Sequence, residues 1–161
     1  MDQVIFKNIP DELKMFSNWV AWRFENIRGR AKSAKVPINP KTGERASVTN
    51  PAHWGAFGES VIAMERYEAN GIGLVLAMNT KAAGITCIDL DSCRDAETGE
   101  WSPEVLEIIK NFNSYTEISQ SGKGLHLFIK AEWPEDGKRA GIIEIYKNKR
   151  FIAMTGNLLG V

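Results

Sequence analysis

The sequence has 161 residues, 43% of them hydrophobic, and its 20 basic and 20 acidic side chains give a net charge of zero. A chain of this length buries roughly 70% of its unfolded surface, which is enough for a real core. Its charged fraction of 25% is that of an ordinary globular protein, which argues against wholesale disorder. No apolar run approaches the ~18 residues of a membrane span, and the N-terminus lacks a signal pattern. Two cysteines and two separated histidines exclude a disulfide framework, a structural zinc site and a His-pair metal motif. We therefore expect a soluble cytoplasmic protein that makes no contact with a membrane.

The first half of the sequence predicts two helices and a strand around a long basic loop. Proline in the first turn marks both helix starts, and Asn50 is a capping residue for the second. Aromatic and β-branched residues mark the strand, and glycines and prolines punctuate the loop or loose hairpin. The helices, the strand and the loop span residues 10–16 and 50–67, 18–25, and 26–50.

The second half predicts mainly strands, with one amphipathic helix that Ser102 opens. The predicted strands span residues 71–77, 84–91, 114–119, 124–130, 142–146 and 151–154. The strands are interspersed with only a few helices, and successive strands are close enough in sequence to pair as hairpins. This order predicts an α+β fold with a mixed or antiparallel sheet.

Charge is unevenly distributed along the chain. Residues 28–45 carry six bases and one acid, and residues 138–150 carry five bases and one acid. Residues 89–107, between these runs, carry seven acids and one base. This separation suits a metal-binding centre flanked by anion-binding walls, although solvated loops and a helix face would give the same pattern.

Three predicted strands place polar side chains between aliphatic ones. Asp89 and Asp91 lie two residues apart, so their side chains leave the same face of a strand. Glu144 stands between two isoleucines, and His126 between two leucines. If these strands are neighbours, three carboxylates converge, and a hard cation such as Mg²⁺ or Mn²⁺ relieves their repulsion. Taken singly, each residue can instead be a turn cap, an exposed edge residue or a structural histidine.

The segment Ser119–Gly124 (SQSGKG) leads directly into the strand of His126. Its glycines and serines allow backbone N–H groups to face an anion, and Lys123 adds a positive charge. A β-hairpin turn is the alternative, since glycine and serine favour it equally. The segment is not a phosphate-binding P-loop, because Gly124 follows the lysine where Ser or Thr is required.

The ordered motifs resemble those of the archaeo-eukaryotic primase superfamily. They are hydrophobic-Asp-hydrophobic-Asp at 88–91, Ser-Gly-x-Gly-x-His at 121–126 and hydrophobic-Glu-hydrophobic at 143–145. The sequence is most similar to the primase-polymerase domains of phage, plasmid and mobile-element replication proteins, over roughly residues 19–157. Many members have Ser where this chain has Gly124, so Ser121 or Lys123 is expected to take over the phosphate contact. Supporting segments are Lys35–Pro37, Asn39–Gly43, the helix of Trp54, Tyr115–Ser119, Arg150–Phe151 and Thr155–Gly156.

The resemblance implies a catalytic sheet like that of an RNA-recognition motif (RRM), packed against a small N-terminal α/β lobe, with the active site in the cleft between them. It also implies one primase-polymerase catalytic domain over residues 1–161, of the kind that stands at the N-terminus of longer replication proteins. Its substrates would be a DNA template and primer with dNTPs or NTPs, and a fused or associated helicase is a common partner.

The leading hypothesis is template-directed nucleotidyl transfer with two divalent ions about 3.5–4 Å apart. In this hypothesis Asp89, Asp91 and Glu144 are the catalytic metal ligands, and the basic run 28–45 follows the template backbone. The residues expected to contact the nucleotide are Ser121, Lys123, His126, Arg150 and Lys35.

Two other classes of function remain open. Clustered acids also suit a metal-dependent nuclease, but Glu144 and Lys147 are one residue too far apart for the restriction-type signature. A non-catalytic module would bind nucleic acid or nucleotide without turnover.

Overall fold

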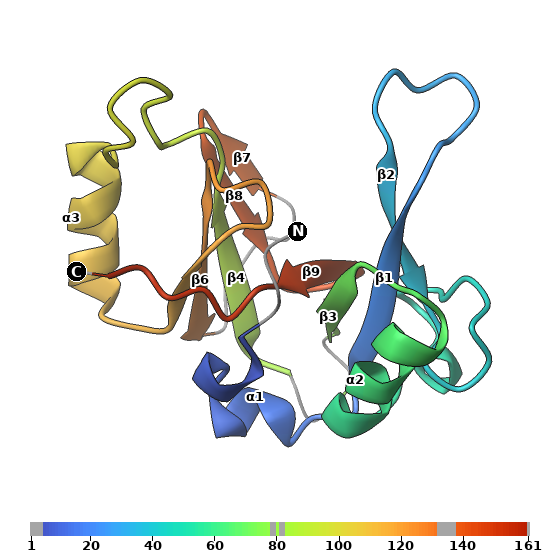
Figure 1. Cartoon of the computed structure of the whole chain (residues 1–161). Helices are drawn as coiled ribbons and strands as arrows, with labels where there is room; N and C mark the ends of the chain where they lie inside the picture. Colours follow the sequence, from blue (N-terminus) through green and yellow to red (C-terminus); the bar gives the residue numbers. More distant parts are fainter. Residues whose placement is uncertain (1–4, 78–79, 81–82, 132–137, 161) are drawn as a thin grey trace.

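The computed structural model describes residues 5–77, 80, 83–131 and 138–160, which form two antiparallel sheets and a few helices (Figure 1). The α+β class predicted from the sequence is therefore confirmed. No helix in these ranges is long and apolar enough to cross a membrane. The elements in chain order are η1 (Phe6–Asn8), α1 (Asp11–Lys14), β1 (Trp19–Glu25), β2 (Ala34–Ile38), η2 (Pro51–His53), α2 (Phe57–Arg66), β3 (Gly71–Leu76), β4 (Ile85–Leu90), α3 (Pro103–Phe112), β5 (Thr116–Ile118), β6 (Leu125–Lys130), β7 (Lys138–Ala140), β8 (Ile143–Tyr146) and β9 (Arg150–Met154).

Sheet A has the strand order β2-β1-β3-β9. Its first three strands come from the first half of the chain, whereas β9 comes from the end of the chain and pairs antiparallel with β3. All six residues of β3 are buried, as its continuous apolar run predicts. Sheet A is therefore complete only when the end of the chain has joined it.

Sheet B has the strand order β5-β6-β4-β8-β7, with β4 at its centre. One face packs against α3, whose buried Val105 and Ile109 contact aliphatic residues such as Ile88 and Leu127. Ser102 caps α3 as predicted, since its side chain accepts a hydrogen bond from the N–H of Val105.

The other face of sheet B packs against sheet A. Cys87, Phe128 and Tyr146 from sheet B lie in one buried cluster with residues of sheet A that include Trp19 and Leu74. This apolar core joins the two sheets, and the polar residues described below begin where it ends.

The helix predicted over 50–67 is interrupted, which corrects the prediction. It consists of η2 and α2, with Asn50 capping η2 through a hydrogen bond from the N–H of Ala52. Gly55 lies between them and exchanges backbone hydrogen bonds with Trp19 at 2.9 and 3.0 Å. A helix through Gly55 would lose this pairing with β1, so the tertiary contact overrides the local helical pattern.

The basic segment 26–50 folds as the loose hairpin that was one of its two predicted forms. Its returning strand, β2, pairs antiparallel with β1 and forms an edge of sheet A. Pro37 is compatible with this position because an edge strand leaves one row of N–H groups unpaired. The sequence did not predict β2 as a strand, nor the short edge strand β7.

Candidate active site

Every strand of sheet B contributes one side chain to a single polar row. Along the register, Glu117 (β5) lies opposite His126 (β6), which lies opposite Asp89 (β4). Asp89 in turn lies opposite Glu144 (β8), which lies opposite Arg139 (β7). Directly opposed residues of an antiparallel pair point to the same face, so these five residues, here called the polar row, share one face. The expectation that the strands of Asp89, His126 and Glu144 are neighbours is confirmed.

The polar row lies on the face of sheet B that turns toward sheet A. It is two residues along each strand from Cys87, Phe128 and Tyr146, which are buried in the core between the sheets. His126 is 6% exposed and Glu117 is fully buried. The polar side chains therefore leave the face opposite the aliphatic one, as predicted, but they enter a partly covered site.

A cavity of about 310 Å³ opens over the polar row. Asp89, His126 and Glu144 line it from sheet B, whereas Lys35 of β2 and Arg150 of β9 line it from sheet A. Five of the eight predicted site residues therefore meet at one cavity. Asp91, Ser121 and Lys123 are not part of its lining.

Asp89 is surrounded by charges of both signs. Burial is the main cause that raises its pKa above the ordinary value, and the carboxylates of Asp91 and Glu144 raise it further. His126, whose Nε2 lies 3.9 Å from Oδ1 of Asp89, and Lys35 oppose this rise. The folded protein therefore holds a carboxylate whose negative charge is incompletely compensated.

Lys35 faces these carboxylates from the other sheet. Burial lowers its pKa below the ordinary lysine value, and Asp89 and Asp91 partly counteract this. Its ammonium group lies 5.5 Å from the ring centroid of Trp22 in β1. The hairpin of β1 and β2 thus brings a cation to the acidic site.

Glu144 already has two partners. Its carboxylate accepts one hydrogen bond from the hydroxyl of Tyr146 and forms an ion pair with Arg139, whose Nε lies 3.1 Å from Oε1 of Glu144. Arg150 lies over the ring of Tyr146, with its Cζ 4.2 Å from the ring centroid. Tyr146 and Arg139 were not among the predicted site residues.

Asp91 lies just beyond the end of β4. Its N–H still donates to the carbonyl of Ile142 at 2.9 Å, which continues the pairing with the segment before β8. Its side chain is exposed. Within the described ranges, no three acidic, histidine or cysteine side chains are already arranged to hold a metal ion.

The donor chemistry nevertheless fits a hard divalent cation. Asp89, Asp91 and Glu144 offer carboxylate oxygens only, and the raised pKa of Asp89 marks negative charge that a cation would offset. A cation bound to Glu144 would compete with Arg139 and Tyr146 for its oxygens.

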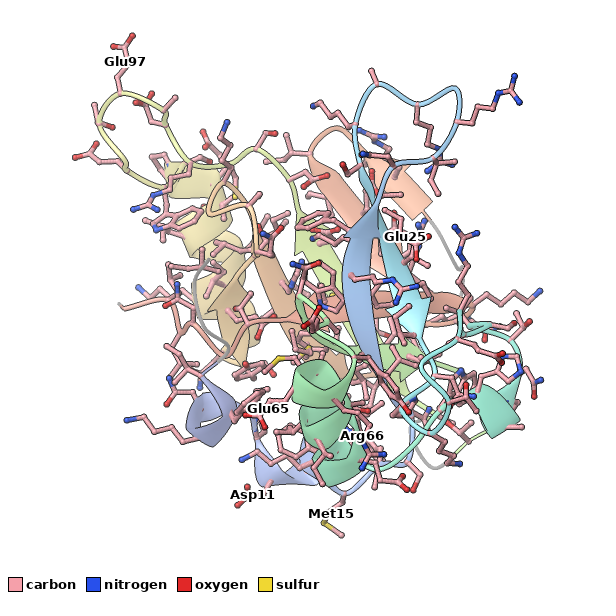
Figure 2. All side chains as sticks on the ribbon, turned by 45° about the vertical axis from the view of Figure 1, so that its right-hand side comes forward. Asp11, Met15, Glu25, Glu65, Arg66 and Glu97 are labelled. Atoms are coloured by element: carbon pink, nitrogen blue, oxygen red, sulfur yellow. The ribbon has the colours of Figure 1, made fainter. Side chains whose placement is uncertain are left out.

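Asp95 and Glu97, two further acids of the run 89–107, do not line this cavity. Glu97 lies at the outer end of the loop that follows β4, away from the body of the molecule (Figure 2). Asp95, in the same loop, accepts hydrogen bonds from the N–H groups of Glu97 and Thr98, which lower its pKa. For these residues, the solvated-loop interpretation of the charge pattern is correct.

The segment 119–124 forms the β-hairpin turn that was its alternative interpretation. Its N–H groups largely bond within the turn: those of Ser119 and Gly122 to carbonyls, and those of Lys123 and Gly124 to the hydroxyls of Ser121 and Ser119. A Cβ at Gly124 would lie 2.6 Å from the carbonyl oxygen of Leu90, so a serine does not fit there without backbone movement. The anion contacts of Ser121 and Lys123 stay predictions.

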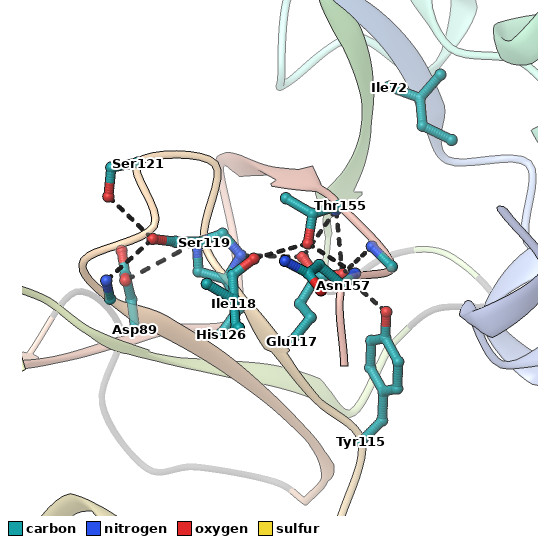
Figure 3. A network of polar contacts seen from close by, with 12 residues as sticks. Ile72, Asp89, Tyr115, Glu117, Ile118, Ser119, Ser121, His126, Thr155 and Asn157 are labelled. Atoms are coloured by element: carbon teal, nitrogen blue, oxygen red, sulfur yellow. Dashed lines mark hydrogen bonds and ion pairs between the residues drawn. The ribbon is translucent and has the colours of Figure 1, made fainter. Parts of the chain in front are cut away.

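Glu117 is a member of the polar row that sequence reasoning missed. Its carboxylate accepts hydrogen bonds from the hydroxyl of Tyr115 and from the N–H groups of Thr155 and Gly156, and one oxygen lies 3.1 Å from Nδ1 of His126 (Figure 3). The hairpin turn carried a usable signal. Pairing Ser119 with Gly124 and counting back along both strands places Glu117 opposite His126.

No family model matches this chain. A search of curated proteins found that it is 36% identical, over 155 residues, to a protein of Nitratiruptor phage NrS-1 named DNA primase-polymerase. The alignment covers 91% of this chain and 20% of the phage protein, so the chain spans about a fifth of the length of that relative. This similarity supports the resemblance to primase-polymerases that the motifs indicated.

Proposed function

We propose that this chain is a primase-polymerase catalytic domain that adds dNTPs or NTPs to a DNA-templated chain in the replication of a phage or other mobile genome. The observation that carries the proposal is the meeting of Asp89, His126 and Glu144 with Lys35 and Arg150 around one cavity. The similarity to the phage protein over 91% of the chain supports it independently.

The layout of sheet B supports the RRM-like part of the proposal. Helix α3 connects β4 to β5, the hairpin of β5 and β6 returns beside β4, and β8 pairs with the other edge of β4. The cavity has walls from both sheets, which supports an active site between the catalytic sheet and the N-terminal lobe. The proposal treats residues 1–161 as one catalytic domain.

We assign Asp89, Asp91 and Glu144 as the ligands of Mg²⁺ or Mn²⁺ in a two-ion site. When bound, such ions lower the pKa of an attacking hydroxyl and neutralise triphosphate charge. Asp89 is the central ligand of the proposal because it lies between His126 and Glu144 in the polar row, and because burial raises its pKa.

The basic side chains would bind the triphosphate. Lys35 and Arg150 line the cavity opposite the carboxylates, and the Arg150 guanidinium makes a cation–π contact with the ring of Tyr146. His126 would present Nε2, the ring nitrogen on the Asp89 side, as a polar contact to the substrate. These residues orient the nucleotide and offset its charge.

The test is extension of a primed DNA template with dNTPs and Mn²⁺. We expect wild type to extend the primer, and Asp91→Asn to reduce extension by roughly 100-fold or more, as is typical when a catalytic group is removed. Asp95→Asn, an exposed acid outside the site, is the matched control and should extend like wild type. Equal extension by wild type and Asp91→Asn would contradict the metal assignment.

The same assay separates the alternatives. Degradation of DNA that is indifferent to added nucleoside triphosphate would indicate a nuclease. Binding of DNA or nucleotide without extension, and with no change in melting temperature on adding Mg²⁺ with dNTP, would indicate a non-catalytic module.

The exposed tip of the β1–β2 hairpin is expected to contact the template backbone. Replacing Arg30 and Lys32 with Ala should weaken template binding and reduce the slope of log K against log salt concentration by about 1.4, at about 0.7 per contact with single strands. Binding isotherms at several salt concentrations measure this slope. The paired control is Lys7→Ala with Lys110→Ala, which should leave the slope unchanged; equal slopes for both pairs would contradict the prediction.

A further inference from the structure

Glu117 is a buried carboxylate to which the proposed function gives no direct role. It is fully buried on β5 and contacts neither the cavity nor solvent. Its partners are nonetheless numerous: both of its oxygens lie 3.1 Å from the N–H of Thr155, and Oε2 also accepts from Gly156 at 2.8 Å and from Tyr115 at 2.7 Å. A buried carboxyl group without hydrogen-bond partners would be costly. The groups around Glu117 therefore decide which hydrogen bonds its two oxygens make.

Two of the groups named above, the backbone N–H groups of Thr155 and Gly156, can only donate to Glu117. The Tyr115 hydroxyl donates to it as well. A carboxylate satisfies them because it is an acceptor at both oxygens. The remaining neighbour is Nδ1 of His126, which lies 3.1 Å from Oε1. Because a carboxylate oxygen only accepts, Nδ1 forms this hydrogen bond by donating a proton to it.

We infer that Glu117 is a positioning residue for His126: it keeps a proton on Nδ1 and holds the ring so that Nε2 faces Asp89 and the cavity. The geometry of Figure 3 shows the same order, with Glu117 between the Thr155 segment and His126, and His126 between Glu117 and Asp89. That His126 then contacts substrate rests on the proposed function, whereas the placement of its proton does not.

The inference also gives a role to the Thr155–Gly156 turn. This turn follows β9 of sheet A and donates two N–H groups to an acid of sheet B. The turn is itself tied to the N-terminal segment, since Ile5 donates to the carbonyl of Thr155 at 2.8 Å and the Asn8 side chain donates to that of Gly156 at 3.0 Å. Glu117 therefore links the position of the Thr155–Gly156 turn to the orientation of the His126 ring.

The chain offers a favourable test because it has two histidines of opposite expected tautomer. In His53, Nδ1 accepts a hydrogen bond from the N–H of Ser47 at 3.0 Å, so this ring nitrogen is expected to carry no proton. In His126, Nδ1 is expected to carry the proton. Spectra of ¹⁵N-histidine-labelled protein, without metal or nucleotide, distinguish protonated from unprotonated ring nitrogens.

Glu117→Gln is the variant that probes the contact. An amide has one acceptor oxygen, so its NH₂ group must face a donor on one side, either His126 or the Thr155 turn. We expect the ring signals of His126 to change and those of His53 to stay. Thr86→Val is the matched control, because it removes a different side-chain hydrogen bond of sheet B, from Oγ1 of Thr86 on β4 to the carbonyl of Ala131, without touching the polar row.

In primer extension, Glu117→Gln should lower kcat/KM by about 10- to 100-fold, mainly through a higher KM for dNTP, while Thr86→Val stays within about twofold of wild type. A His126 Nδ1 without a proton in wild type overturns the inference, even if the variant does not fold. So does a Glu117→Gln spectrum that changes no more than that of Thr86→Val. If wild type extends no primer but Nδ1 of His126 is protonated, the proposed function fails and the positioning by Glu117 stands.

Discussion

Replacing Asp89 with Asn is expected to lower the rate of primer extension by about 1,000-fold or more. The same substitution should raise the melting temperature at neutral pH by about 2–4 °C. Activity falls because the amide removes the central carboxylate of the proposed cation site. Stability rises because burial and neighbouring acids raise the pKa of Asp89, so that its ionisation at neutral pH works against the folded state. Melting curves and extension assays on the same preparations measure both effects.

The pH dependence of the stability effect follows from the direction of the pKa shift. Below the unfolded pKa of about 3.8, Asp89 is protonated in both states and the wild type has no penalty. As pH rises through the raised folded pKa, the wild type loses stability that Asp89→Asn retains. The difference between the two proteins should therefore grow from acid to neutral pH.

Asp95→Asn provides a control of opposite sign. Backbone N–H groups of Thr98 and Glu97 lower the pKa of Asp95, so its charge favours the folded state and its removal should lower the melting temperature slightly. Mg²⁺ should stabilise wild type and Asp95→Asn, but not Asp89→Asn. A less stable Asp89→Asn that still extends primers would contradict the assignment of Asp89.

Replacing Gly156 with Ala is expected to destabilise the protein by about 2–5 kcal/mol, or about 5–15 °C in melting temperature. Gly156 has a φ of +64°, which alanine adopts at a cost, and its added Cβ would lie 2.3 Å from the carbonyl oxygen of Ile5. The backbone of Ile5 bonds to that of Thr155 and Asn8, and the N–H of Gly156 donates to the Glu117 carboxylate. The clash is between the added Cβ and a main-chain atom, so it cannot be relieved by rotating a side chain.

Gly84→Ala separates the two costs. Gly84 has a φ of +86°, but nothing lies within 4 Å of a Cβ added there. It should therefore show the backbone cost alone, about 1–2 kcal/mol. Equal destabilisation by both substitutions would mean that the close approach of Ile5 and Gly156 contributes nothing to stability.

The sequence predicted the polar row where local alternation was sufficient. Asp89, His126 and Glu144 each stand between aliphatic residues, so the strand period of two assigns their faces without knowledge of the fold. The same argument predicted the aliphatic face of sheet B, and the helical period predicted that α3 is amphipathic. These features depend on neighbours along the chain, which a single sequence contains.

The rest depends on contacts between distant segments. Lys35 and Arg150 reach the cavity because sheet A brings β2 and β9 to it, and no local pattern encodes that pairing; the resemblance alone suggested them. The break at Gly55 reflects a bridge to Trp19, a residue far along the chain. Glu117 was missed because its position opposite His126 is evident only when the register of the β5–β6 hairpin is known.

The position of β9 in sheet A also affects how the protein can fold during its synthesis. Strands β1–β3 leave the ribosome before β9. Until Met154 has been translated, the edge of β3 that pairs with β9 has no partner, and the strand is apolar throughout. Unpaired apolar edges of this kind are prone to association with other chains. We therefore expect nascent chains that end before β9 to bind chaperones or aggregate, and the two sheets to form together in one late step.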